Sequence, residues 1–293
     1  MSKGSMFWSN ARGKVGDVVF SNVKGQTITR KYQPCPANPR TDAQQLQRAK
    51  FSNAVKFFKH AQQAYFRFAY EDKKKTESDY NAFMRYNAGV AMLPTREQYL
   101  GMYPSIGSKY QLAAGSLPSI DRVYPSAGKV SFVLGTADWA EKPTVGNAST
   151  ALVSEYGLQS GDIITLLRIH CQGTYKIESQ PKHQPVWTIS QFRVDESSTQ
   201  LLSDAVADEF FVFTKEGTTG SLDATMDDEG CVMASIVVSR VLTSGTKVSD
   251  SYLHLDTIAQ EIYNNSLADS WRTAALASWS ASGAAVLQGS LSE

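Results

Sequence analysis

The chain has 293 residues and a formal net charge of +1 at pH 7, and 42% of its residues are hydrophobic, 11% aromatic and 19% charged. This composition is typical of a globular protein and excludes an intrinsically disordered chain. The length allows a sizeable core and predicts two domains. Because the net charge is close to zero, the chain as a whole gives no indication of nucleic-acid binding.

The charge is nevertheless unevenly distributed along the chain. Residues 1–75 carry 15 Lys and Arg against 4 Asp and Glu, a net charge of +11, whereas residues 76–293 carry 14 against 24, a net charge of −10. A basic N-terminal part can bind nucleic acid by neutralising phosphates. It can equally bind the acidic part of a neighbouring copy, which favours head-to-tail assembly.

Residues 1–35 are expected to form a basic N-terminal arm with a β-hairpin. Lys14–Phe20 is short and rich in valine, and Gln26–Tyr32 alternates between two faces. The intervening segment, residues 21–25, has the length of a turn and ends in a glycine. An isolated hairpin is only marginally stable in water. This hairpin must therefore lie on helices of its own chain or on another chain.

Residues 36–107 predict a helical unit. Thr41 fits a helix N-cap with Gln44 three residues later, which is the pattern of a capping box. Apolar residues at helical spacing extend this helix to about Tyr70. Two further helices are expected, the second over Ser78–Ala88 and a short third over Thr95–Met102.

Residues 108–255 contain short β-branched and aromatic runs separated by Gly, Ser, Asp and Pro, a pattern typical of an antiparallel sandwich or barrel. We expect one helix within this region, over Asn147–Tyr156. Residues 256–293 predict a C-terminal helix or arm, with a helix to about Ser278 that Asn264–Ser266 could break. The expected fold class is therefore α+β.

The sequence contains none of the motifs GxSxG, Walker A, GxGxxG or HExxH. The three cysteines, Cys35, Cys171 and Cys231, are too widely spaced for a zinc knuckle, and we expect free, mostly buried thiols. His170 and Cys171 are adjacent on an expected strand, so they point to opposite faces. We expect no catalytic residue, no metal and no cofactor. The long uncharged stretch Thr273–Ser292 is too polar to span a bilayer.

The residues that remain as candidates are basic and aromatic side chains that could contact a partner. Arginine and lysine in a β-ribbon can contact phosphates, and arginine is also enriched in protein interfaces, where it pairs with carboxylates. The candidates for subunit or phosphate contacts are Lys14, Lys24, Arg30, Lys31, Arg40, Gln44 and Arg48. The candidates for hydrophobic interface anchors are Phe7, Trp8, Phe57, Phe66, Trp271 and Trp279, and the tryptophans could equally belong to a core.

Two segments carry a resemblance to a known group, GKVGDVVFSNVKGQTITRKY from Gly13 and NPRTDAQQLQRAKFSNAVKFF from Asn38. This N-terminal region resembles that of Bacteroidetes and phage proteins of unknown function. It resembles more closely that of a virion protein of crAss-like bacteriophages. The segment Ala234–Leu255 is similar to a late strand pair of the same group. The pattern consists of Gly13, Lys14, Gly16, Gly25, Gln26, Arg30, Asn38, Pro39, Thr41, Gln44 and Arg48.

The resemblance implies a structural protein of a podovirus-like phage that forms a tail or collar ring below the portal. A collar of that kind has about twelve copies by analogy, assembled head to tail. The implied partners are further copies of the chain and neighbouring tail-ring, portal or tail proteins. DNA in the lumen is a further implied contact, and no membrane is implied. The implied location is the virion, assembled in the host bacterial cytoplasm. Some relatives are described as integration-host-factor-like DNA binders, so DNA binding through the basic hairpin is the alternative.

Overall fold

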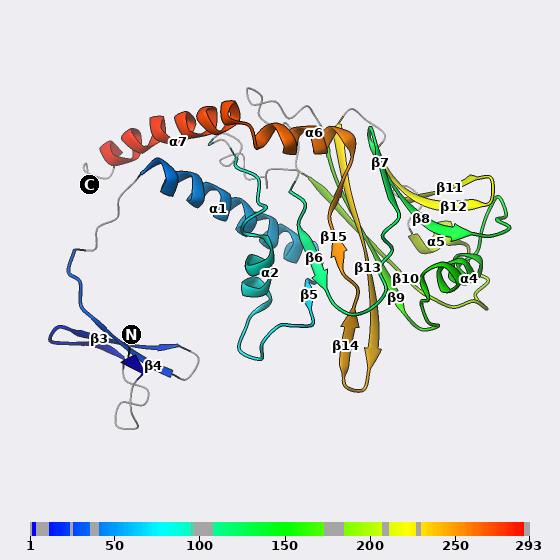
Figure 1. The fold of residues 1–293 in the computed structure, drawn as a ribbon, viewed down its shortest axis with the longest axis horizontal. Coiled ribbons are helices and arrows are strands. Elements are labelled where there is room, and N and C mark those ends of the chain that lie inside the picture. Colours follow the sequence, from blue (N-terminus) through cyan, green and yellow to red (C-terminus); the bar gives the residue numbers. More distant parts are fainter. Residues whose placement is uncertain are drawn as a thin grey trace. The chain divides into compact units, whose positions relative to one another are not determined.

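The computed structural model shows a mixed α+β protein, as predicted (Figure 1). It describes residues 2–3, 12–23, 26–35, 41–94, 96, 108–172, 185–206, 211–226 and 230–289. The chain divides into two compact units. The first unit comprises residues 1–44 and 74–76, and the second comprises residues 45–73 and 77–293.

The first unit contains a four-stranded antiparallel sheet, called the N-terminal sheet below, with the strand order β1-β4-β3-β2. The predicted hairpin is present, but its first strand is interrupted because Gly16 adopts a positive φ of 58°. The strand after this turn continues to Val23, which pairs with Gln26, so only two residues connect the hairpin strands instead of the predicted five. The strands are β1 (Ser2–Lys3), β2 (Gly13–Val15), β3 (Val18–Val23) and β4 (Gln26–Lys31).

Helix α1 (Asp42–Gln63) begins directly after Thr41, as predicted, but ends seven residues before the predicted Tyr70. The end is a Schellman motif, in which Tyr65 takes the left-handed conformation with φ 62°. The Phe66 N–H donates to the Ala61 carbonyl at 2.9 Å, and the Tyr65 N–H donates to the Gln62 carbonyl at 3.0 Å. A glycine usually occupies this left-handed position, and its absence explains why the end of the helix could not be recognised from the sequence.

The chain then forms strand β5 (Ala69–Tyr70) and helix α2 (Asp79–Asn87). The Ser78 hydroxyl caps α2 by accepting a hydrogen bond from the Asn81 N–H, which confirms the predicted second helix. The predicted third helix lies outside the described residues.

The predicted strands after residue 108 are present and pair mainly in antiparallel sheets (Figure 1). The central sheet has the order β10-β9-β13-β14, with β16 also paired to β13, and the outer sheet has the order β11-β12-β8-β7. A small sheet, β15-β6-β5, joins β5 and β6 in parallel. The sequence pattern did not predict β7, β12 and β14, because these strands are short or polar. The bounds are β6 (Gln111–Ala114), β7 (Val123–Ser126), β8 (Lys129–Thr136), β9 (Ile163–Gln172), β10 (Val186–Arg193), β11 (Phe211–Glu216), β12 (Thr219–Thr225), β13 (Gly230–Leu242), β14 (Gly245–Val248), β15 (Ser251–Tyr252) and β16 (His254–Leu255).

The central sheet is covered on both faces. On one face, Leu166 and Ala234 pack with Phe132 of the outer sheet and with helices α4 (Val145–Tyr156) and α5 (Leu202–Val206). On the other face, Leu167 and Met233 belong to the same hydrophobic core as α1 and α2. Because β13 is buried on both faces, its sequence is almost continuously apolar. The central sheet therefore separates two cores, one shared with α1 and α2 and the other with α4, α5 and the outer sheet.

The C-terminal region forms α6 (Thr257–Ser266) and α7 (Asp269–Gly289) instead of one helix, with the break just after the three residues predicted to cause it. Asp256 caps α6, and its carboxylate also accepts hydrogen bonds from the N–H groups of Val232 and Gly128. This residue thus ties α6 to β13 and to the β7–β8 turn. No helix in the described part of the chain is long and apolar enough to cross a membrane.

Candidate interaction surface

The basic residues predicted as contacts are distributed over both faces of the N-terminal sheet. Lys14 pairs with Val19, and Val19 pairs with Arg30, so these three side chains form one row on one face. Lys31 lies on the opposite face, in a row with Val15 and Val18. Each face therefore combines a positive charge with valine side chains.

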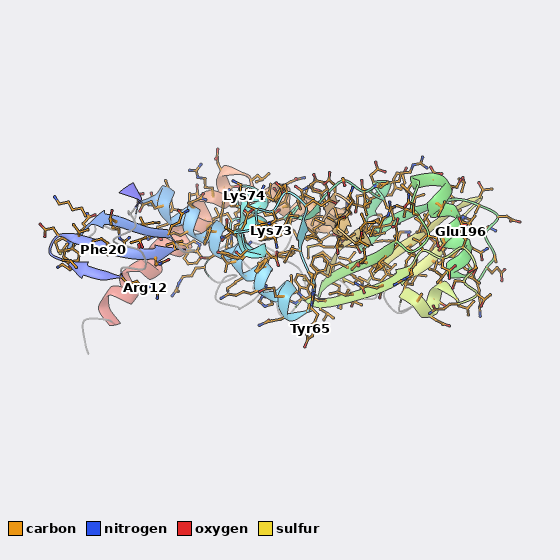
Figure 2. All side chains as sticks on the ribbon, turned by 90° about the horizontal axis from the view of Figure 1, so that it is seen from below. Arg12, Phe20, Tyr65, Lys73, Lys74 and Glu196 are labelled. Atoms are coloured by element: carbon orange, nitrogen blue, oxygen red, sulfur yellow. The ribbon has the colours of Figure 1, made fainter. Side chains whose placement is uncertain are left out.

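These side chains are exposed or partly exposed to solvent. Figure 2 draws the side chains of this region and labels two of them, Arg12 and Phe20. Val15 is 65% exposed, Val23 51% and Val18 39%. Thr27 is the only buried residue among those of the first unit whose exposure the structure describes. The Lys14 ammonium lies 3.5 Å from the centre of the Tyr32 ring, a cation–π contact that orients this cation over the sheet. The N-terminal sheet thus presents apolar and basic groups without burying either face in a core of its own.

Two further candidates lie at the start of α1. Gln44 and Arg48 are four residues apart on the helix, so they share one face, and both are exposed. Four other candidates, Phe7, Trp8, Lys24 and Arg40, lie outside the described residues.

The other aromatic candidates contribute to the core of the second unit. Phe57, Phe66 and Trp271 are each less than 5% exposed. The Phe57 ring centre lies 4.3 Å from that of Tyr110, and the Trp271 Nε1 donates to the Leu93 carbonyl at 2.9 Å. These three side chains stabilise the fold of one chain and are not available to a neighbouring subunit.

Trp279 is half-buried, and its Nε1 donates to the Pro94 carbonyl at 3.0 Å. It therefore also holds α7 against the same loop as Trp271. The exposed apolar groups that sequence reasoning missed are the valines of the N-terminal sheet. Their signal was present in the sequence, since both faces of the predicted hairpin mix charged and apolar residues and neither could form a dry core.

A pocket of about 390 Å³ lies in the second unit, between the segment after α1 and the end of the central sheet. Arg67 and Tyr65 are the ionisable side chains that line it, so the lining offers no nucleophile paired with a base. Among the described residues, no group of His, Cys, Asp and Glu is placed to hold a metal ion. The lining residues are Tyr65, Phe66, Arg67, Phe68, Ala69, Thr165, Ile189, Gln191, Val237, Ser239, Thr246 and Val248.

The buried charges of the second unit are used in hydrogen bonds within the fold. The Asp223 carboxylate, which is 1% exposed, accepts hydrogen bonds from Lys129 Nζ at 2.8 Å and from the Thr214 hydroxyl at 2.9 Å. Arg168 Nε donates to the Thr225 carbonyl at 2.8 Å. Burial raises the pKa of Asp256, against four backbone N–H groups that lower it. These arrangements fasten strands and helix ends to one another.

The structure is that of an α+β protein with an exposed N-terminal sheet. Residues 10–154, just under half of the chain, match the model of a family of unknown function, DUF6266. The match includes β2–β4, α1, α2 and the first strands of the second unit, and it assigns no activity. Neither the curated proteins nor the solved structures contain a match.

Proposed function

We propose that this chain is a structural subunit of a phage virion, which assembles head to tail into a tail or collar ring below the portal. Its partners in this proposal are further copies of itself and adjacent tail or portal proteins, and DNA in the lumen is a possible contact. Assembly takes place in the cytoplasm of the host bacterium. The resemblance of the N-terminal motif to crAss-like phage proteins supports the virion part of the proposal. The exposed N-terminal sheet supports the assembly part.

The observation that carries the proposal is the exposure of the N-terminal sheet. A small sheet without a hydrophobic face packed on other elements is marginally stable. Both hydrophobic cores of the described chain begin at Leu46 or later, so the sheet contributes nothing to either. Burying Val15, Val18 and Val23 against a partner would provide about 0.5–1 kcal/mol per valine, because each is already partly buried. The sheet is therefore expected to be completed by another protein surface.

The net charges of the two units indicate which protein surface completes the sheet. The first unit carries 9 Lys and Arg against 2 Asp and Glu, a net charge of +7, and the second carries 20 against 26, a net charge of −6. Opposite potentials steer association and suppress wrong partners. A contact between the first unit of one copy and the second unit of the next is heterologous. It closes into a ring if the rotation per subunit divides a full turn.

The experiment that tests this proposal reverses charge on one face of the N-terminal sheet. The double variant Lys14→Glu with Arg30→Glu is compared with Lys59→Glu and Arg272→Glu, which changes the net charge equally at two exposed helix positions. We expect the sheet variant to shift sedimentation from the assembled species to monomer while the control still assembles. Assembly of the sheet variant at the concentration required by the wild type would refute the proposed interface.

A second candidate function is DNA binding, as in the integration-host-factor-like interpretation. The row of Lys14 and Arg30 on one face of a narrow β-ribbon favours it, because such ribbons enter DNA grooves. In that case, affinity for duplex DNA falls steeply as salt concentration rises. Fluorescence anisotropy with a labelled duplex measures this directly, and the absence of binding at low salt would eliminate the DNA candidate.

A further inference from the structure

Two of the three cysteines lie directly opposite each other in the central sheet. Cys171 of β9 pairs with Cys231 of β13, and both thiols are free and buried. The orientation of the pair follows from Val232, whose N–H and carbonyl are hydrogen-bonded to Asp256 and so point away from β9. The neighbouring Cys231 therefore directs its backbone groups toward β9. In such hydrogen-bonded antiparallel pairs the Cα atoms lie about 5.5 Å apart.

That Cα separation lies in the range that disulfides span, and the two side chains project from the same face of the sheet. The Cβ atoms of a hydrogen-bonded pair lie about 5.5 Å apart, so the two strands must approach by about 1 Å at this position for the bond to form. The two side chains lie close enough to interact, because a hydrogen bond that the Cys231 thiol donates to the Cys171 sulfur is the first cause that raises the pKa of Cys231. Neither residue is needed elsewhere in the functional proposal above. Both project into the core that the central sheet shares with α1 and α2.

We propose that Cys171 and Cys231 are a redox site that closes to a cross-strand disulfide in an oxidising thiol–disulfide buffer. With oxidised glutathione as the oxidant, one cysteine thiolate attacks a sulfur of the glutathione disulfide. A mixed disulfide forms and one glutathione thiolate leaves. The second cysteine thiolate then attacks the protein sulfur of the mixed disulfide and displaces the second glutathione. The two protein thiols lose two protons and two electrons, and the glutathione disulfide is reduced to two thiols.

The position of the pair in the ladder determines how fast the reaction proceeds. The thiols are shielded in the folded protein, and the raised pKa of Cys231 keeps it protonated, so direct attack on the native state is slow. The pair is, however, the last but one of the described β9–β13 ladder, since only Gly230 and Gln172 pair beyond it. Opening this end of the ladder exposes both thiols without unfolding the protein. Because both thiols are accessible in the unfolded chain but only during such openings in the folded protein, oxidation is faster during folding than in the native protein.

The test uses the full chain with Cys35→Ser, because Cys35 is exposed and would otherwise react with oxidants or with a second chain. This variant is unfolded, refolded in a mixture of oxidised and reduced glutathione at mildly alkaline pH, and mapped by mass spectrometry without reduction. We expect peptides containing residues 171 and 231 to be joined in most chains. A second variant, Cys35→Ser with Cys171→Ser, should show no joined peptides.

If refolding is incomplete, the native Cys35→Ser protein is incubated in the same buffer with urea below its unfolding transition. The folded fraction is then mapped, and the same joined peptides are expected. Free thiols at both positions, or separate glutathione adducts on them, in folded protein from either route would overturn the proposal.

Discussion

The Asp162 carboxylate binds the Arg240 guanidinium through two parallel hydrogen bonds, Nε to Oδ1 at 2.6 Å and Nη2 to Oδ2 at 2.8 Å. The carboxylate is 1% exposed and the guanidinium side chain 20% exposed. Asp162 also accepts the N–H of Gln159 at 2.9 Å. This ion pair connects the start of β9 to the far end of β13, the two strands that form the middle of the central sheet.

Replacing the Asp162 carboxylate tests how much its ion pair with Arg240 contributes to the stability of the fold. Asp162→Asn leaves the Arg240 charge without its partner in a largely buried position, so we expect the free energy of unfolding to fall by about 3 kcal/mol. Chemical denaturation measures the change. The control is Glu155→Gln, which breaks an ion pair with Arg122 whose arginine side chain is 52% exposed, and it should cost less than about 1 kcal/mol. Equal losses in the two variants would contradict this assignment.

The left-handed residue after α1 offers a stabilising change. Tyr65 is 91% exposed and has a φ of 62°, a conformation that costs a residue with a Cβ atom about 1 kcal/mol or more. Tyr65→Gly should therefore raise the free energy of unfolding by about 1 kcal/mol. Tyr65→Ala keeps the Cβ atom and serves as the control, with an expected change of less than about 0.5 kcal/mol. A Gly variant no more stable than the Ala variant would show that the cap is not strained.

His254 should make stability depend on pH. Burial, and secondarily the charge of Lys109, lower the pKa of this imidazole from 6.5 to about 4. The unfolded chain thus binds a proton between pH 6.5 and 4 that the folded chain does not, so stability falls as pH falls through this window. The shift corresponds to at most about 3 kcal/mol. Carboxylates also titrate near the lower end of this pH window. The contribution of His254 is therefore measured as the difference in the free energy of unfolding between the wild type and a variant without this histidine.

The measurement is urea denaturation of the wild type and His254→Gln at pH values from 7.5 to 4. The stability difference between them should change in favour of the variant as the pH falls below 6.5, and it should level off near 4. A difference that is independent of pH would mean that His254 has an ordinary pKa in the folded protein.

Gly220 in β12 is required by close packing against a tryptophan. A Cβ atom at this position would lie 2.4 Å from Cε2 of Trp139, whose side chain is 2% exposed and cannot move away. We expect Gly220→Ala to lower the free energy of unfolding by about 2 kcal/mol, as for other overpacked cores. Gly89→Ala is the matched control, because its Cβ would meet no atom within 4 Å. Thermal unfolding of both variants provides the comparison.

Long helices and strands with a regular apolar pattern could be predicted from the sequence. The end of α1 and the polar strand β12, which depart from that pattern, could not. The apolar spacing of α1 was sufficient to place its body, but its end depends on a tyrosine in a conformation that usually requires glycine. Strand β12, with the sequence TGSLDAT, was missed because its polar residues serve buried hydrogen bonds such as that of Asp223 to Lys129. Such partners come from distant parts of the chain, so no local pattern reports them.

The interaction surface was predictable in part. The basic character of the hairpin, including Lys14, Arg30 and Lys31, is visible in the sequence, and the structure confirms that these residues are exposed. Whether an aromatic residue packs inside or outside was not predictable, because Phe57 and Phe66 were both expected on a helix whose apolar stripe is wider than one face. In the structure, Phe66 follows the end of α1. Only the packing of α1 on the central sheet shows that both are buried.

The central claim is that the exposed N-terminal sheet joins copies of this chain into a ring. Native mass spectrometry of the purified full-length chain, with negative-stain microscopy of the same sample, measures this most directly, both alone and with neighbouring virion proteins. We expect closed rings with one uniform copy number. A monomer or dimer under all of these conditions would contradict it.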